Sequence, residues 1–567
     1  MSDLYDLKVT GGTIVDGTGA AGFIGDLGIR EGRVVALGAA PLGSRAEIDA
    51  TGLVVCPGFV DMHTHYDAQL LWDRGVSCSP WHGVTTVVIG SCGFGIAPTR
   101  PEHRETVMRT LEKVEGMAYD ALKRGLGDEW PFETYPEYLD VLEERGSAVN
   151  VASYLGHTPL RLSVMGLDAT EREATPAEVA TMRTLVAEAM DAGAIGLSTS
   201  HAAGHHGAGG KPVPSRLAPF EEMDALLGAV AESGRGVFQA AMGRALFNEQ
   251  FDELWDRHGV PTTWTALLAD MAGPGSHERY LETATATQAA GRKIVPQVAC
   301  RPIMMDFHFA EPYPFEILDL FGEVMELDSA GKRELYADGA FRERFREISD
   351  PGSKNVNSGW TDRTVLSRFD PDPSMEERSL AELADERGVH PADLALDLSL
   401  EADLGARFRL AFLNHNEAAV GDLIADPHTI VTLSDAGAHA DQLCDAGYSS
   451  HLLGHWVRDR QVMTLEAAVH ELTQRPADLM RIADRGVLQE GRPADVVVFD
   501  AETIAAGPVR RVRDLPGNAE RLVSDAVGVA AVIVNGVVIR AEGHDALDEG
   551  GGGELPGRLL RGGVATQ

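Results

Sequence analysis

Short apolar runs, many of them rich in β-branched residues, recur along most of the chain and alternate with amphipathic helical patterns. The runs read GVTTVVIGS, VNVASYLGH, GAIGLSTS, GRGVFQAA, VPTTWTALLA, GRKIVPQVA and HTIVTLSD. Between two of them lies TPAEVATMRTLVAEAMDAG, with Pro near its start and Gly just past its end, the usual order at helix ends. Strands that are apolar on both faces and alternate with helices are typical of a parallel sheet. About eight in succession predict an α/β protein with a (β/α)₈ barrel, here over about residues 58–485.

The two ends of the chain have a different pattern. Residues 1–57 contain short alternating strands separated by glycine turns, as in DLKVTGGTIVDG and DLGIREGRVVALG. Residues 486–567 repeat this pattern in PADVVVFD and VAAVIVNGVVIRAEG, and then run into a glycine-rich tail. We therefore expect the two ends to pair into one small β domain beside the barrel.

The segment from about 301 to 375 fits the barrel rhythm poorly. It contains PYPFEILDLFGEV, DPGSKNVNSGW and DPDPS, which match neither the strand nor the helix pattern of the barrel. Long irregular connections in compact domains are usually functional. We predict an insertion here and regard it as a candidate lid over the barrel mouth.

Composition and charge narrow the class of protein. The chain has 567 residues and a formal charge of −37, which argues against binding nucleic acid or an anionic membrane, because both require a basic face. No apolar run is long enough to span a membrane. Five scattered cysteines give no disulfide pattern, and the start of the chain lacks the features of a secretion signal. We expect a cytoplasmic protein acting on a small molecule. The sequence is compatible with a homo-oligomer and leaves the oligomeric state open.

Candidate metal ligands stand at the ends of the first two predicted strands. His63 and His65 follow the apolar run VVCPGFV two residues apart, so their side chains point to the same side of a strand. Alone, this pair is equally well explained as two structural polar residues. The strand GVTTVVIGS leads to Cys92 in a glycine-rich loop, where an isolated cysteine is usually inert. A thiolate beside two imidazoles, however, is a good site for Zn²⁺.

The last apolar strand, HTIVTLSD, ends at Asp435. A carboxylate there can contact a water at the metal, act as general base and pass the proton to the leaving group. Ser-Asp after a strand also suits a helix N-cap. Four residues of suitable type at three strand ends nevertheless favour a single site, because these ends surround the mouth of a barrel. We predict His63, His65, Cys92 and Asp435 as metal ligands, with Asp435 also catalytic.

Several stretches make the sequence resemble the amidohydrolase superfamily and, within it, the N-acyl-D-amino-acid deacylase (D-aminoacylase) branch. They are VVCPGFVDMHTHYDAQLLWD, HGVTTVVIGSCGFGIAP, YLGHTPLR, GAIGLSTS, VTLSDAGAH and GVLQEGRPADVVVFD, and they cover nearly the whole chain. The resemblance implies a zinc-dependent hydrolase of a C–N (amide) bond, with a TIM-like barrel and a small β-sandwich built from both chain termini. It matches His63, His65 and Cys92 to metal ligands and Asp435 to the catalytic aspartate. The Gly-Cys-Gly loop of this branch replaces a carbamylated barrel lysine.

Two histidines that the resemblance leads us to expect are missing. The family has one on the fifth strand, in a THMR-like motif, and one on the sixth, in an SHxK-like motif. The corresponding positions here hold Ala241 and either Ala266 or Leu267. Catalytic Zn²⁺ needs about three protein ligands and a water, so the remaining donors suffice for one ion rather than two. The substrate is then an N-acyl-D-amino acid or, with a rearranged site, another compound such as a cyclic amide, a lactone or a different small amide. A homologue that only binds a ligand is the third alternative.

Several other histidines are candidates for contacts near the substrate. His157 matches the family motif YLGHTPLR and is expected beside the substrate, behind the ligands, or in packing. His201, His205 and His206 follow the fourth strand, where substrate contact or solvent exposure is favoured over metal ligation. His439, just after the last strand, either reaches the site or begins a helix.

The missing THMR-like motif also removes an arginine that the family offers to the substrate carboxylate. A guanidinium can hold a carboxylate through two bonds. Arg301, Arg161 and Arg216 are candidates to replace it, although arginines are most often surface residues.

Overall fold

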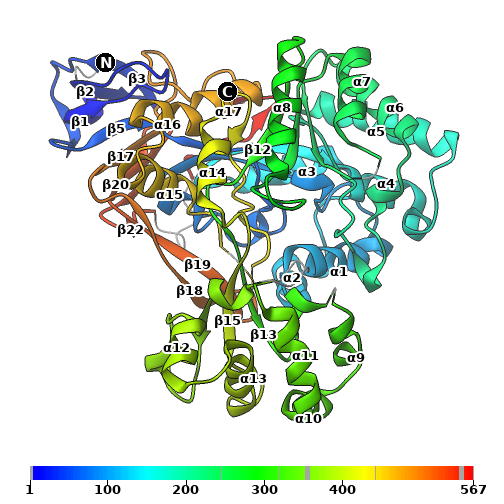
Figure 1. Cartoon of the computed structure of the whole chain (residues 1–567). Helices are drawn as coiled ribbons and strands as arrows, with labels where there is room; N and C mark the ends of the chain where they lie inside the picture. Colours follow the sequence, from blue (N-terminus) through cyan, green and yellow to red (C-terminus); the bar gives the residue numbers. More distant parts are fainter. Residues whose placement is uncertain are drawn as a thin grey trace.

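The computed structural model describes residues 4–243, 245–316, 318–351, 358–440, 442, 444–547 and 555–565. At its centre is a barrel of eight strands, each pairing in parallel with the next (Figure 1). In order they are β6 (Phe59–Asp61), β7 (Val84–Ile89), β8 (Asn150–Gly156), β9 (Gly196–Ser200), β10 (Val237–Ala241), β11 (Thr262–Leu267), β12 (Ile294–Val298) and β16 (Ile430–Val431). A bridge between Thr64 and Ala436 joins the two ends of this sheet. The predicted barrel is confirmed.

The apolar runs are strands because both of their faces are covered. Every residue of β7 and β8 is buried, since the barrel interior lies on one side and helices lie on the other. The helix predicted from TPAEVATMRTLVAEAMDAG is α5 (Pro176–Ala192), which begins with a capping box between Thr175 and Glu178 and ends at Gly193 with φ 111°. The other barrel helices are α1 (Arg104–Glu115), α2 (Tyr119–Leu126), α3 (Tyr135–Arg145), α4 (His157–Met165), α6 (Phe220–Glu232), α7 (Asn248–His258), α8 (Ser276–Ala289), α14 (Glu417–Ala425), α15 (Tyr448–His451), α16 (Leu465–Leu472) and α17 (Gln474–Leu479). Within the described ranges, no helix is both long enough and apolar enough to cross a membrane.

The two chain ends share one mixed sheet of nine strands. The N-terminal part supplies β1 (Tyr5–Ile14), β2 (Phe23–Arg30), β3 (Arg33–Gly38), β4 (Ser44–Asp49) and β5 (Val54–Pro57), and the C-terminal part supplies β17 (Val496–Phe499), β20 (Val529–Val534), β21 (Val537–Ala541) and β22 (His544–Asp545). Antiparallel pairing of β5 with β17 joins the two parts. Both ends therefore build one β domain, as predicted. Most of the glycine-rich tail lies outside the described residues.

The insertion is a separate lobe with an aromatic core of its own (Figure 1). It contains a three-stranded antiparallel sheet of β13 (Ile303–His308), β14 (Thr364–Arg368) and β15 (Arg407–Leu413), together with α9 (Gly322–Met325), α10 (Ser329–Ala337), α11 (Gly339–Ser349), α12 (Leu380–Arg387) and α13 (Pro391–Glu401). The predicted end of the insertion at about 375 is too early, because α12, α13 and β15 belong to the core of the lobe. Their regular apolar patterns resemble those of barrel elements, so the pattern alone assigned them to the barrel.

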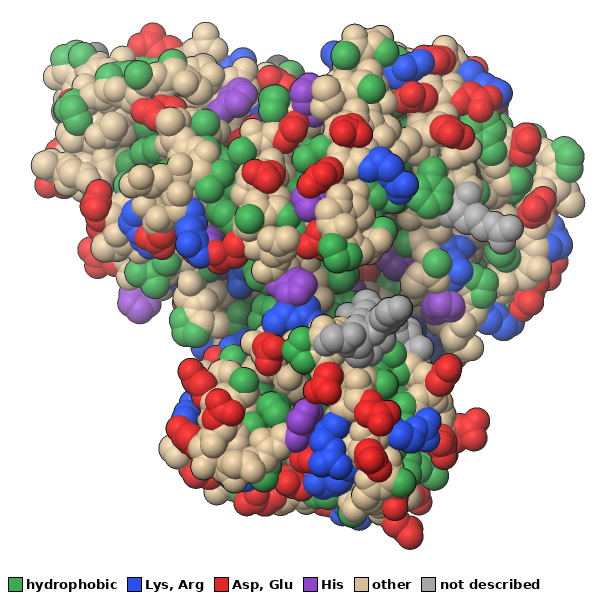
Figure 2. Space-filling view, viewed as in Figure 1, with side chains coloured by type: hydrophobic (Ala, Val, Ile, Leu, Met, Phe, Trp, Pro, Cys, Tyr) green, Lys and Arg blue, Asp and Glu red, His purple; other side chains and the backbone are tan. Residues whose placement is uncertain are grey.

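The lobe is attached at the mouth of the barrel. It follows the C-terminal end of β12, and Asp306 N donates to Gln442 O over 2.7 Å. A hairpin of β18 (Ala505–Leu515) and β19 (Ala519–Val527) extends from the C-terminal part to the same region, where Arg511 Nη2 lies 3.0 Å from Asp306 Oδ1. The molecule narrows between barrel and lobe, and acidic side chains are spread over the face shown in Figure 2. The lobe and the hairpin thus border the mouth at which the candidate residues gather.

Candidate metal centre

Three strand ends bring the candidate donors together. His63 and His65 follow β6, and Cys92 stands in the turn after β7. In the described part of the chain, these three residues are the one group of three or more His, Cys, Asp or Glu side chains placed to hold a metal ion, with ligand atoms within 4.8 Å of one another. All three are buried. Cys92, 27 positions after His65 in the sequence, therefore lies in the same small volume as the two histidines.

Asp435, after β16, completes the group. Its Oδ1 lies 3.0 Å from His63 Nε2 and 3.3 Å from His65 Nε2, and its side chain is 28% exposed. Cys92 Sγ lies 3.4 Å from His63 Nε2. The two imidazoles and the thiol suit Zn²⁺, and the Asp435 carboxylate lies beside both imidazoles, where it can serve as a fourth ligand. The residues present therefore fit one ion.

The backbone at two of these residues has an unusual conformation. Cys92 has φ 55° and Asp435 has φ 47°, in the left-handed region that non-glycine residues seldom adopt. Such conformations persist only where the surrounding structure holds them, and they cluster at functional sites. Here they turn the thiol and the carboxylate towards the same point.

The charges of the four groups are interdependent. Burial opposes ionisation, but hydrogen bonds and the charges of His63 and His65 outweigh it and hold the pKa of Asp435 well below its usual range. Burial likewise opposes the thiolate, yet the charge of His63 lowers the pKa of Cys92. Cys92 and Asp435 in turn raise the pKa of His63 to about 10, against the effect of burial. The acidic groups and the histidines therefore stabilise one another's charged forms in the metal-free protein, and a divalent cation can take the place of protons on the histidines.

Three polar side chains that the sequence reasoning missed orient these groups. His63 Nδ1 lies 2.7 Å from Gln297 Oε1, so it donates to the amide oxygen and leaves Nε2 facing the group. Gln239 Oε1 accepts from Cys92 N over 2.7 Å. His65 Nδ1 lies 3.0 Å from Glu115 Oε1, at the end of α1. The sequence could have pointed to the two glutamines, because each is a polar residue inside an otherwise apolar strand, in GVFQAA and IVPQVA.

The opposite side of the mouth has no histidine. Ala241 and Leu267, at the ends of β10 and β11, are both buried, and Ala266 precedes Leu267. The polar group nearest to the thiol on this side is Thr265, whose Oγ1 lies 3.9 Å from Cys92 Sγ. The second pair of nitrogen donors implied by the family resemblance is therefore not replaced here by other side chains of the described strands.

The remaining predicted residues lie outside the group of four. His157 is buried behind β9, with Nδ1 2.9 Å from Thr199 Oγ1 and Nε2 2.8 Å from Glu222 Oε1. Arg161 pairs with the same glutamate. These contacts agree with the expectation that His157 is a packing residue. They also occupy Arg161, so its guanidinium is directed at Glu222 and not at a substrate.

Two further predicted residues, Arg301 and His439, lie apart from the four donors. Arg301 Nε lies 3.6 Å from Asp445 Oδ1. His439 has φ 49° and lies in the loop after Asp435, without starting a helix. No contact described here joins either side chain to the donor group.

The three histidines after β9 differ in exposure and in their distance from the donor group. His201 is buried and His206 is exposed. His205 lies closest to the centre: its ring centroid is 5.2 Å from that of Phe94, which is 6.3 Å from that of His65. Ser200 Oγ lies 2.6 Å from His205 Nδ1, and Arg216 Nη1 donates to His205 O over 2.9 Å. Of the three, His205 is therefore the one placed to face a ligand at the mouth.

Comparisons with known proteins agree with this geometry. The amidohydrolase family matches residues 46–258 and 336–540. An uncharacterised protein of Mycobacterium tuberculosis is 30% identical, over 99% of this chain and 96% of its own. D-aminoacylase of Alcaligenes xylosoxydans is 29% identical, over 95% of this chain and 96% of its own. The crystal structure of N-acyl-D-glutamate deacylase from Bordetella bronchiseptica, complexed with zinc and a phosphonate inhibitor, has a TM-score of 0.66 at 26% identity and covers 98% of this chain and 100% of that one.

The amidohydrolase match and the similarity to deacylases make this chain a metal-dependent hydrolase of carbon–nitrogen bonds other than peptide bonds, and the donors at the barrel mouth agree with this class. The chain belongs to the amidohydrolase family, and its similarity to the D-aminoacylase branch is confirmed. The stretch between the two matched ranges, from 259 to 335, contains β11 and β12. The strand where the second expected histidine is missing therefore lies in the stretch that the family model does not match.

Proposed function

We propose that this protein is a deacylase of N-acyl-D-amino acids that uses one zinc ion held by His63, His65, Cys92 and Asp435. The observation that carries the proposal is the convergence of these four donors at three strand ends, in a chain similar to D-aminoacylase over nearly its whole length. One ion follows from the apolar ends of β10 and β11. The expected products are a carboxylate and a free D-amino acid.

Each residue has a distinct task in the proposed reaction. A bound zinc ion polarises the scissile carbonyl and lowers the pKa of a water molecule. Asp435 accepts the proton of the attacking water at its carboxylate and delivers it to the nitrogen as the C–N bond breaks. The Asp435 carboxylate lies 3.0 Å from His63 Nε2 and 3.3 Å from His65 Nε2, beside the atoms that would hold the ion. Gln297 holds the His63 ring in the orientation that directs Nε2 towards the centre.

A second candidate is hydrolysis of a different small amide, such as a cyclic amide. The observation that favours it is the pair Ala241 and Leu267, which replaces two family histidines with apolar side chains. The arginine of the same motif is absent as well. A substrate without a carboxylate would not need that arginine.

The experiment is a metal analysis followed by a substrate screen. We expect about one zinc per purified chain and release of D-amino acids, but not L-amino acids, from N-acyl substrates, measured by chiral chromatography. Cyclic amides serve as the comparison set. One zinc per chain with turnover of cyclic amides alone would select the second candidate, and a chain that binds no metal after growth with zinc would refute both.

We also propose a cytoplasmic location. All five cysteines, Cys56, Cys78, Cys92, Cys300 and Cys444, are free, as expected for a reducing compartment. A thiolate in the proposed centre likewise requires protection from oxidation. Fractionation of the producing cells with an antibody against the chain tests this location.

A further inference from the structure

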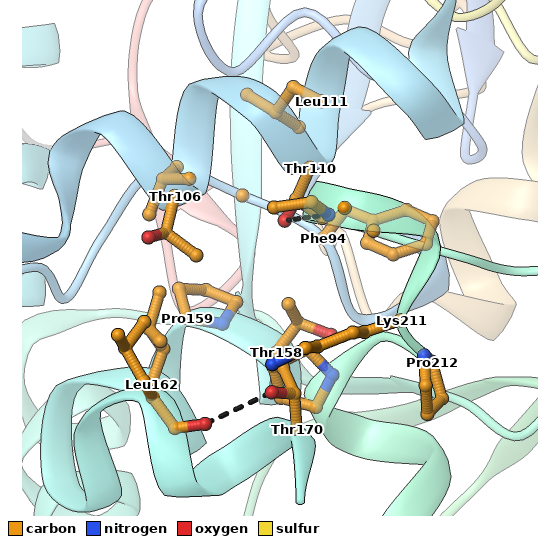
Figure 3. Close-up of a pocket in the computed structure, with 17 residues that line it drawn as sticks. Phe94, Thr106, Thr110, Leu111, Thr158, Pro159, Leu162, Thr170, Lys211 and Pro212 are labelled. Carbon is orange, nitrogen blue, oxygen red and sulfur yellow. Dashed lines mark hydrogen bonds between the residues drawn. The ribbon is translucent and has the colours of Figure 1, made fainter.

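A separate apolar cavity lies beside the candidate metal centre. Its volume is about 270 Å³, and it lies between α1, α4 and residues 207–214 (Figure 3). Its apolar wall includes Phe94, Val107, Leu111, Pro159, Leu162 and Pro212. An apolar cavity of about 150 Å³ can hold benzene, so this one admits an alkyl chain of roughly six to eight carbons.

Most polar side chains around this cavity, Thr106 excepted, already have partners. Thr110 Oγ1 accepts from Ala208 N over 3.4 Å, and Thr170 Oγ1 donates to Leu167 O over 3.0 Å. Lys211 is the one lining residue with a charged side chain, and its ammonium group pairs with Glu171. Its aliphatic stem therefore lines the cavity while its charge is compensated outside. These features suit a hydrocarbon ligand better than a charged one.

The cavity and the metal centre share structural elements. Phe94 lines the cavity and follows Cys92 by two residues, and its ring centroid is 6.3 Å from that of His65. Helix α1, which supplies one wall, ends at Glu115, whose carboxylate lies 3.0 Å from His65 Nδ1. The Phe94 ring therefore stands between the donor group and the cavity, and a molecule that occupies both has to pass this ring.

We propose that this cavity binds the acyl chain of the substrate, so that the enzyme acts on medium-chain N-acyl compounds in preference to N-acetyl ones. The inference rests on the proposed deacylase function. Each methylene buried in an apolar site contributes about 0.8 kcal/mol, equivalent to about a fourfold gain. We expect kcat/KM to rise about fourfold per methylene from acetyl towards octanoyl and then to level off.

The test uses a substitution at the edge of the cavity that places a large side chain inside it. Thr106 projects from α1 towards the cavity (Figure 3), and no hydrogen bond of its hydroxyl is described. Thr106→Trp places an indole in the space of the acyl chain. Glu105→Trp is the matched control, because Glu105 is the exposed neighbour on the same helix and does not line the cavity. Circular dichroism spectra and zinc contents equal to those of the wild type show that both variants are folded.

Two measurements separate this inference from the proposed function. The first is the acyl-length series of kcat/KM, which is expected to become flat in Thr106→Trp and to stay steep in Glu105→Trp. The second is calorimetric binding of octanoate and acetate to the zinc-loaded protein. Octanoate should bind at least about tenfold more tightly, except in Thr106→Trp.

The outcomes are distinct. Selective octanoate binding that Thr106→Trp abolishes, without hydrolysis of any N-acyl amino acid, would support the cavity and refute the deacylase. Hydrolysis with equal kcat/KM for acetyl and octanoyl substrates, together with equal binding of the two carboxylates, would overturn the acyl-chain inference and leave the deacylase intact.

Discussion

The two sides of the barrel mouth differ in the kind of residue that ends their strands. The side formed by β6, β7 and β16 presents His63, His65, Cys92 and Asp435 within hydrogen-bonding or ion-pairing distances. The side formed by β10 and β11 ends in the buried, apolar Ala241 and Leu267. One side of the barrel mouth carries the candidate donors, while the strand ends of the other side contribute packing.

Strands β10 and β12, which supply none of the four donors, still support them from within the barrel. Gln239 lies on β10 and Gln297 on β12, and their amide oxygens bond Cys92 N and His63 Nδ1. A strand can therefore orient a metal ligand through a hydrogen bond without supplying a ligand of its own. The following predictions test this division, from the largest expected effect to the smallest.

Cys92→Ala should have the largest effect. The change removes the sulfur donor, so we expect zinc to fall from about one per chain towards none. Activity should fall by at least the roughly 10²–10⁴-fold that general acid–base catalysis alone supplies. Elemental analysis and initial rates check this. Cys56→Ala, at a buried thiol in β5, is the control and should keep its zinc.

Asp435→Asn should lower kcat by about 10²–10⁴-fold, because an amide cannot accept the proton of the attacking water. The expected signature is low activity with zinc still bound by His63, His65 and Cys92. Rates and zinc content measured on the same preparation check it. Activity within a factor of three of the wild type would exclude Asp435 as the base.

Gln297→Leu should weaken zinc binding about 10–100-fold, the usual cost of losing a group that orients a histidine ligand. A chelator competition titration measures this. Gln239→Leu removes a bond to backbone N–H instead, and we expect a smaller loss. Equal zinc affinities in both variants and the wild type would mean that neither glutamine orients a metal ligand.

Zinc affinity should rise with pH. The pKa of His63 is about 10 in the metal-free protein, so below that pH zinc must displace a proton from the ring. The apparent affinity should therefore increase about tenfold per pH unit for this proton, from pH 6 to 9, and decrease as the pH falls. Chelator competition at several pH values checks the slope. A pH-independent affinity would mean that His63 is not a ligand.

The hydrophobic pattern and the fold agree closely in the barrel and less well in the insertion. The apolar runs from GVTTVVIGS to HTIVTLSD are the barrel strands β7–β12 and β16, because each is covered on both faces. Residues 380–413 have equally regular patterns, yet they pack on the aromatic core of the lobe. Periodicity predicts that a face is buried and does not say against which partner.

The sequence by itself determined the type and approximate position of the barrel elements, the pairing of the chain ends, and His63, His65, Cys92 and Asp435 as candidates, because these depend on local spacing and residue chemistry. Only the tertiary structure decided that the four converge, that Gln297, Gln239 and Glu115 orient them, and that His157 and Arg301 are engaged elsewhere. It also placed an apolar cavity beside Phe94. Such relations join residues tens to hundreds of positions apart, and their distances depend on how the whole barrel closes.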